Sequence, residues 1–423
     1  MMYKTSPLHI AFFKGNRSFK HSLSFLAILF VLLCTFSAYG YAKSDISNKW
    51  VGTWSTSPQL VEPGNMPPSP GLNNNTLRQV VRVSIGGDSL RIRFSNEFSK
   101  GTVTMKAVQV AISTGGSTIE TSTNKELKFN GNAGITMNPG TTSYSDPIAF
   151  ALKPRMDIAI SISFGQTSPD VTGHPGSRTT SYLLAGNKTS TNDFTGSVQT
   201  DHWYGIIGID VRADTSSASV AILGNSITDG RGSGTNRQNR WPDILSECLL
   251  KNAKTSQVGV LNLGIGGNCV LRNCLGPSGL SRFKRDILDQ QGVRWCIVLE
   301  GINDIGQTPD SVVAFQVAND LIAAYKQMIQ DAHAKGIKVY GATILPFKKS
   351  FYYTDYREDA RNTVNEWIRT GGYFDAVIDF DKVMRDPNDP LSISPVAQSG
   401  DYLHPNEAGY KMLGEAIDVS LFE

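Results

Sequence analysis

The pattern of hydrophobic and polar residues divides the chain into two parts. Up to about residue 212, apolar and polar residues alternate with a period of two in short runs, separated by clusters of Gly, Asn, Ser and Thr. Such runs predict β-strands, here at 77–85, 90–94, 103–112, 148–152, 158–164 and 205–211. The turn residues at 86–89 predict a hairpin between the first two. Because no helical period persists, we expect an all-β, sandwich-like domain.

From residue 218 onward, short apolar runs alternate with segments of helical period. Strands are predicted at 219–223, 258–263, 295–299, 337–345 and 376–380, and helices at 312–334, 357–369 and 407–421. Strands separated by helices indicate a mostly parallel sheet covered on both faces. The short polar stretch 213–217 predicts the domain boundary, which gives a β domain at 43–215 and an α/β domain at 216–423.

Residues 1–42 have the pattern of a signal peptide. Lys14, Arg17 and Lys20 precede an apolar run at 23–36, and small residues follow this run. The run is shorter than a membrane-spanning helix requires, although an uncleaved anchor is the alternative. We therefore expect export to the periplasm or the extracellular space, with no stable membrane insertion after cleavage.

The charge and the cysteines narrow the possible functions. The net charge of +3 lies partly in the first twenty residues, and no basic stripe indicates a nucleic-acid partner. No pair of histidines has metal-ligand spacing and no C-x-x-C is present, so we expect neither a metal nor a cofactor. A local disulfide between Cys269 and Cys274 is plausible in an exported protein, whereas Cys248 and Cys296 are expected to be buried thiols.

Polar residues with catalytic chemistry follow several strands of the α/β part. Ser226 comes directly after the strand at 219–223, and open α/β sheets place their ligand sites at the carboxyl ends of their strands. A serine hydroxyl needs a base to become a nucleophile. His404 is the only histidine in the loops of this part that follows a carboxylate, Asp401, at short spacing. These three residues therefore predict a Ser-His-Asp arrangement.

An acyl-transfer site also needs hydrogen-bond donors for the oxyanion. The backbone N–H of Ser226, a glycine N–H from the turn at 266–267 and the side-chain amide of Asn303 are candidates, because each follows a predicted strand. Both Gly266 and Gly267 stay open as the glycine donor at this point.

Two other stretches contain residues with catalytic chemistry, but their sequence context gives less support for a role in the active site. Gly87 to Leu90 spells G-D-S-L, but Ser89 is predicted in a turn of the β domain and is not expected to be catalytic. The polar stretch 173–182 contains His174 and is expected to be a connecting loop, with the alternative that it reaches over a neighbouring site.

The α/β part resembles the SGNH (GDSL-type) esterase family in four ordered blocks: 224–226, Gly267, 301–304 and 401–405. The resemblance implies a flavodoxin-like, three-layer α/β/α fold. It implies Ser226 as the nucleophile, with Asp401 and His404 completing the triad. It also implies Gly267 and Asn303 as oxyanion donors together with the serine amide. Asn225 departs from the aspartate that is commoner before the serine.

The first part, with Trp50-x-x-Thr53-Trp54, is similar to the accessory β domain of two-domain, xylan-esterase-like members of this family. This similarity implies acyl groups, chiefly acetyl, on plant polysaccharides or oligosaccharides. The expected partner is thus an acylated carbohydrate or a small ester, and the β domain either binds carbohydrate or forms a wall of the site. Two alternatives stay open: a lipase or arylesterase, and a non-catalytic carbohydrate-binding protein.

Overall fold

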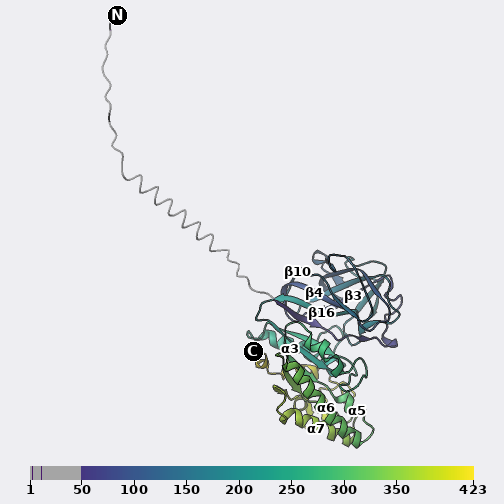
Figure 1. Ribbon diagram of the computed structural model, residues 1–423, viewed down its shortest axis with the longest axis vertical. Coiled ribbons are helices and arrows are strands. Elements are labelled where there is room, and N and C mark those ends of the chain that lie inside the picture. Colours follow the sequence, from purple (N-terminus) through teal and green to yellow (C-terminus); the bar gives the residue numbers. More distant parts are fainter. Residues whose placement is uncertain (1, 3–10, 12–48) are drawn as a thin grey trace. The chain divides into compact units, whose positions relative to one another are not determined.

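A computed structural model describes residues 2, 11 and 49–423, so the predicted signal peptide falls almost entirely outside the described residues. The N-terminal part of the described chain consists of β-strands (Figure 1). One antiparallel sheet has the order β1 (Lys49–Ser55), β16 (Ile206–Ala213), β4 (Gly87–Asn96) and β10 (Ile148–Leu152), with β9 (Thr141–Tyr144) also beside β4. The second has the order β14 (Val198–Thr200), β13 (Ser181–Ala185), β3 (Asn75–Arg82), β11 (Asp157–Phe164), β5 (Val103–Gly115) and β6 (Thr118–Ile119), with β7 (Lys125–Leu127) and β8 (Ile135–Met137) also beside β5.

The two sheets share one hydrophobic core, as the period-two alternation predicts. Leu90, Ile92 and Phe94 of β4 point into the same buried cluster as Ile158 and Ile160 of β11. Alternating strands bury one face in this way, because successive side chains point to opposite sides of a sheet.

The predicted hairpin at 86–89 is wrong. β3 pairs with β11 and β13, whereas β4 lies in the other sheet, so the connection between β3 and β4 crosses from one sheet to the other. A Cβ on Gly86 would lie 2.4 Å from the carbonyl oxygen of Leu152. Glycine is therefore needed here for close approach of two backbones, rather than for a hairpin turn.

The described chain also contains a small third sheet, separate from these two. It has the order β15 (Trp203–Tyr204), β12 (Thr172–His174) and β2 (Gln59–Leu60). The stretch 173–182 is therefore not simply a loop, since His174 ends a buried strand.

The α/β part is built on a five-stranded parallel sheet. The strands lie in the order β18 (Val258–Gly264), β17 (Ala218–Gly224), β19 (Val293–Leu299), β20 (Lys338–Ala342) and β21 (Ala376–Ile378). Numbered within this part, the order is 2-1-3-4-5, which is that of flavodoxin-like sheets. The predicted α/β fold is confirmed, although β20 ends three residues before the predicted strand does.

Helices cover both faces of this sheet. One face packs against α3 (Trp241–Lys251), α8 (Phe380–Met384) and α9 (Glu407–Glu415), and the other against α4 (Gly279–Phe283), α6 (Ser311–His333) and α7 (Asp355–Thr370). Two short helices, α2 (Ser226–Asp229) and α5 (Ile302–Gly306), begin at the carboxyl ends of β17 and β19.

A π-helical turn at Lys284–Leu288 extends α4, and a two-stranded ribbon of β22 (Arg385–Asp386) and β23 (Asp389–Ile393) follows α8. Three-residue 3-10 turns lie at Pro63–Asn65 and Thr121–Thr123. The last predicted helix ends at Glu415 and is followed by a 3-10 turn at Val419–Phe422. Among the described residues, none of the helices is long and apolar enough to span a membrane.

The β-rich and α/β parts form one compact unit. The carbonyl oxygen of Gly52 in β1 accepts a hydrogen bond of 2.7 Å from Ser219 Oγ, and the Gly52 N–H donates to the carbonyl oxygen of Gln291 at 2.9 Å. Farther along the chain, Ser57 Oγ lies 3.0 Å from the carbonyl oxygen of Leu263, at the carboxyl end of β18. These contacts bring β2 and the segment after it to the edge of the sheet where the predicted site lies.

Candidate active site

Ser226 is the first residue of a helix that begins directly after a buried strand. Asn225 caps this helix, because its side-chain oxygen accepts the N–H of Ile227 at 3.0 Å. A Cβ on Gly224 would lie 2.1 Å from Thr228 Oγ1, so only glycine allows the helix to fold back this tightly on the strand. The turn therefore places Ser226 at the carboxyl edge of the sheet, as predicted.

The side chains of Ser226, His404 and Asp401 form a continuous chain of contacts. Ser226 Oγ lies 2.8 Å from His404 Nε2, and His404 Nδ1 lies 2.6 Å from Asp401 Oδ2. Since an ionised carboxylate only accepts hydrogen bonds, Nδ1 carries the proton and Nε2 is free to accept one from the serine hydroxyl. A nucleophile in contact with a base, and a base oriented by a carboxylate, is the arrangement of a serine hydrolase.

The two titrating groups of this chain are held in the states that the chemistry requires. Burial lowers the pKa of His404, and the charge of Asp401 only partly offsets this effect. Burial raises the pKa of Asp401, but hydrogen bonds from the His404 side chain and from the backbone N–H groups of His404 and Leu403 outweigh it and lower that pKa to about 2. At neutral pH the imidazole is therefore neutral and the carboxylate is ionised.

The loop that carries Asp401 and His404 is strained at one residue. Tyr402 has a φ of 54°, which is the left-handed region that non-glycine residues rarely adopt. This turn brings the N–H groups of Leu403 and His404 to within 3.0 and 2.9 Å of Asp401 Oδ1. Strain of this kind persists where the surrounding structure enforces it, often at functional sites.

The three predicted oxyanion donors line the same cleft as the serine and the histidine. Gly267 has a φ of 67°, and neither its N–H nor that of Ser226 donates to an acceptor among the residues that the structure describes. Asn303 donates one amide hydrogen to the carbonyl oxygen of Asn268 at 2.8 Å, which leaves its second hydrogen for another acceptor. The N–H groups of Ser226 and Gly267 and the second amide hydrogen of Asn303 thus supply three donors in one cleft, as an oxyanion site requires.

Tyr352 fixes the orientation of the Asn303 amide. Its hydroxyl donates to Asn303 Oδ1 at 3.1 Å, so the amide nitrogen must point to the opposite side. Tyr352 itself lines the cleft. Tyr352 could not be predicted, because the loop at 343–354 that carries it has no recognisable motif.

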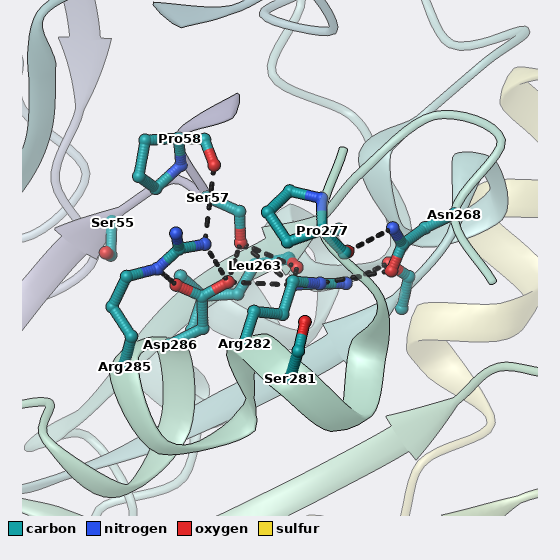
Figure 2. A network of polar contacts seen from close by, with 12 residues as sticks. Ser55, Ser57, Pro58, Leu263, Asn268, Pro277, Ser281, Arg282, Arg285 and Asp286 are labelled. Atoms are coloured by element: carbon teal, nitrogen blue, oxygen red, sulfur yellow. Dashed lines mark hydrogen bonds and ion pairs between the residues drawn. The ribbon is translucent and has the colours of Figure 1, made fainter. Parts of the chain in front are cut away.

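A buried arginine holds the loop that carries Gly267. Arg282 is fully buried, and Figure 2 shows its guanidinium reaching Asn268, Leu263, Ser57 and Asp286. Its Nε donates to Asn268 Oδ1 at 3.0 Å, and Asn268 is the residue that also accepts from Asn303. The disulfide between Cys269 and Cys274 closes the same loop. Arg282 thus connects the oxyanion loop to both parts of the chain.

The cleft around Ser226 has a volume of about 410 Å³. Residues from both parts of the chain form its walls. The β-rich part contributes Gln59, Glu62, Asn65, Pro175, Gly176, Arg178 and His202. The stretch 173–182 therefore does reach the site, which was the alternative interpretation of that stretch.

Residues 222–412 match the model of the GDSL-like lipase/acylhydrolase family. This segment, which is a little less than half of the chain, is similar to that family. The resemblance found in the sequence is thus confirmed, and so is the predicted class of enzyme, a carboxylic ester hydrolase. Comparison of this GDSL-type hydrolase with curated proteins gives no match.

Several solved structures are similar to about half of this GDSL-type hydrolase. A member of the lipolytic G-D-S-L family from Veillonella parvula is 21% identical, and the match covers 47% of this chain and 96% of that one with a TM-score of 0.36. A GDSL-like lipase from Bacteroides thetaiotaomicron is 20% identical over 48% of this chain and 87% of its own, with a TM-score of 0.34. A catalytic mutant of an acetylxylan esterase from Geobacillus stearothermophilus is 18% identical over 47% and 93%, with a TM-score of 0.37.

The G-D-S-L string of this hydrolase is not at the site. Ser89 lies within β4, where it pairs with Ala149 of β10, and not in the predicted turn. It is not among the residues that line the cleft. Of the two thiols outside the disulfide in the described residues 49–423, Cys296 is buried as predicted, whereas Cys248 is only half-buried.

Proposed function

We propose that the protein is an exported serine esterase that removes O-acetyl groups from polysaccharides or oligosaccharides. The observation that carries the proposal is the chain of contacts from Ser226 through His404 to Asp401, beside a cleft with three unpaired hydrogen-bond donors. In this mechanism His404 Nε2 takes the hydroxyl proton of Ser226 while Oγ attacks the ester carbonyl carbon.

The negative charge that develops on the carbonyl oxygen is held by the N–H groups of Ser226 and Gly267 and by the Asn303 amide. The tetrahedral intermediate then collapses, and the protonated His404 gives its proton to the departing sugar oxygen. A water molecule, deprotonated by His404, attacks the acyl-serine, and its collapse releases the carboxylic acid and restores Ser226. Every proton that leaves one oxygen is returned to another, so the cycle needs no cofactor.

The walls of the cleft favour a carbohydrate over a lipid. The side chains that the β-rich part contributes are mostly polar or charged, and they include Gln59, Glu62 and Asn65. Glu62 accepts hydrogen bonds from both amides, at 2.5 and 3.0 Å, so the three are arranged before any ligand binds. Ordered amide and carboxylate groups match sugar hydroxyls, whereas a fatty-acyl chain needs a continuous apolar surface.

A disulfide supports export independently of the signal-peptide pattern in residues 1–42. Cys269 and Cys274 form a disulfide, and disulfides persist in oxidising compartments such as the periplasm or the extracellular space.

A lipase or arylesterase is the second candidate, because two exposed apolar side chains also line the cleft. Leu275 is 49% exposed and Phe351 is 71% exposed. An aryl or acyl group of a small ester would bury part of this surface.

Substrate comparison separates the two candidates. Acetate release from acetylated xylan is measured beside hydrolysis of p-nitrophenyl acetate and p-nitrophenyl palmitate, for the wild type, Ser226→Ala and Ser89→Ala. We expect acetate release and p-nitrophenyl acetate hydrolysis in the wild type and in Ser89→Ala, and loss of both in Ser226→Ala. Hydrolysis of the palmitate ester with no acetate release would favour the lipase, and full activity of Ser226→Ala would refute the proposed nucleophile.

A further inference from the structure

Two arginines lie in the cleft beside the catalytic pair. Arg178 follows β12, and its backbone φ of 51° lies in the left-handed region, so the chain holds the residue in an unfavourable conformation. Arg231 lies two residues after the end of α2, and its N–H donates to the carbonyl oxygen of Ser226 at 2.9 Å. Neither residue has a role in the ester chemistry described above.

The charge of Arg178 is not balanced by its nearest carboxylate. Among the described residues, Asp229 is the only carboxylate within ion-pair distance, with Arg178 Nη2 at 3.6 Å from Asp229 Oδ2. Asp229 Oδ1, however, lies 2.8 Å from His174 Nε2, and His174 Nδ1 lies 2.9 Å from the carbonyl oxygen of Ser57. The charge that Asp229 offers to Arg178 therefore depends on how many protons Asp229 and His174 share.

Hydrogen-bond geometry fixes the number of protons on that pair. A carbonyl oxygen only accepts, so His174 Nδ1 carries a proton. The contact between Nε2 and Asp229 Oδ1 requires one more proton, on one side or the other. The pair is therefore an imidazolium with a carboxylate, or an imidazole with a carboxylic acid, and both have a net charge of zero. Arg178 keeps its positive charge without a net counter-charge.

The hydrogen-bonding capacity of both guanidinium groups is also unused. Arg178 Nε is buried and has no hydrogen-bond partner among the described residues. The side chain of Arg231 makes no ion pair or hydrogen bond within the same residues, while its backbone is fixed at both ends: its N–H donates to Ser226, and its carbonyl oxygen accepts the Tyr410 hydroxyl at 2.7 Å. Both charges act on the same site, since each of them helps burial to lower the pKa of His404.

A guanidinium group is a planar fork of N–H donors that pairs best with a planar carboxylate. An acylated glycan can carry a carboxylate on a uronic acid. We propose that Arg178 and Arg231 form a subsite for this carboxylate. This inference rests on the proposed function, and it makes the preferred substrate an acetylated oligosaccharide that contains uronic acid. Glu62, on the β-rich wall of the cleft, would disfavour a second negative charge beside it.

The test compares two substrates that differ in one group. An O-acetylated methyl glucuronoside carries a carboxylate where the matching O-acetylated methyl glucoside carries a hydroxymethyl group. The ratio of kcat/KM for the two is measured for the wild type, Arg178→Gln, Arg178→Lys and Arg231→Gln. Arg237→Gln is the matched control, because Arg237 lies in the segment that follows Arg231 but is 68% exposed and pairs with Glu407.

We expect the wild type to prefer the glucuronoside, and each glutamine variant to reduce the ratio roughly tenfold, as expected for one hydrogen-bonded charge pair near the surface. Arg178→Lys should retain part of the preference, and Arg237→Gln all of it. The preference should also weaken as salt is raised. A wild type that cleaves both sugars equally, or variants that lose activity on both in the same proportion, would overturn the proposal. Hydrolysis of p-nitrophenyl acetate reports on the ester chemistry separately, so an enzyme that cleaves it without charge preference refutes the subsite alone.

Discussion

Replacing Arg282 with methionine removes the residue that connects the oxyanion loop to the rest of the fold. Methionine has a similar length and no donor, so the change removes the hydrogen bonds while leaving most of the volume filled.

Most acceptors of Arg282 keep another partner when it is removed. The carbonyl oxygen of Gly224 still accepts the N–H of Ile265 at 3.0 Å. Asp286 still accepts from Arg285, at 2.6 and 3.0 Å, and from Ser57 Oγ at 2.7 Å. These groups should therefore contribute little to the loss of stability.

Two acceptors lose their side-chain partner. Within the part of the chain that the structure describes, Asn268 Oδ1 accepts only from Arg282 Nε, and Glu300 Oε1 lies 3.5 Å from Arg282 Nη2. An unsatisfied buried amide oxygen costs about 1–3 kcal/mol, and breaking a buried ion pair costs about 3–5 kcal/mol when the remaining charge cannot be neutralised. Since the pKa of Glu300 is about 8, its carboxyl is already protonated at pH 6 and the cost there comes mainly from the amide oxygen, so we expect Arg282→Met to lower the free energy of unfolding by about 3 kcal/mol at pH 6.

The cost should depend on pH through Glu300. Burial raises the pKa of Glu300 to about 8, although Arg282 acts to lower it. A carboxyl whose pKa is raised on folding stabilises the protein below its unfolded pKa and loses that contribution as the pH rises through the folded pKa. In the variant the pKa is higher still, so the difference in stability should grow by about 1 kcal/mol per pH unit above 8.

Urea unfolding at pH 6 and pH 9 measures both quantities. Lys284→Met is the matched control, because Lys284 is close in sequence to Arg282 but is 73% exposed and pairs with Asp289 at the surface. Its loss should cost less than about 1 kcal/mol at either pH. A cost below about 1 kcal/mol for Arg282→Met, or one that is equal at the two pH values, would refute this reasoning.

Three further predictions concern catalysis. Tyr352→Phe removes one of the two hydrogen bonds that orient the Asn303 amide and leaves only the one to Asn268, so kcat should fall about tenfold with little change in KM, and steady-state kinetics would contradict this if KM alone changed. Asp401→Asn removes the acceptor that keeps the proton on His404 Nδ1, so kcat should fall roughly 10³- to 10⁴-fold, while near-wild-type turnover would exclude Asp401 from the triad. The pH profile of kcat/KM should lose activity as the pH falls through a pKa below the ordinary 6.5 of histidine, because protonated His404 cannot accept the serine proton; a midpoint above 6.5 would contradict the effect of burial.

The parts of the site that local sequence determines could be predicted. Ser226 and Asn303 were found because each lies in the short segment that follows a buried parallel strand, where the topology fixes the position of the chain. Asp401 and His404 were found because the carboxylate lies only three residues before the histidine. In these cases a few neighbouring residues carry the information.

The contributions of distant segments could not be predicted. His174 meets Asp229 across 55 positions of sequence, and Tyr352 meets Asn303 across 49. Neither pair has a spacing rule, because their approach depends on how whole sheets pack. The predicted hairpin at 86–89 failed for a similar reason: Gly86 is required by a neighbouring backbone and not by its own turn.

Covalent labelling of Ser226 tests the central claim most directly. An alkyl fluorophosphonate reacts with an activated serine oxygen, which displaces fluoride and remains attached to phosphorus. Mass spectrometry of the wild type, Ser226→Ala and Ser89→Ala after labelling identifies the modified peptide. We predict one label per chain in the wild type and in Ser89→Ala, on the peptide that contains Ser226, and none in Ser226→Ala. A label on any other residue of the wild type, or an equal label in Ser226→Ala, would contradict the account.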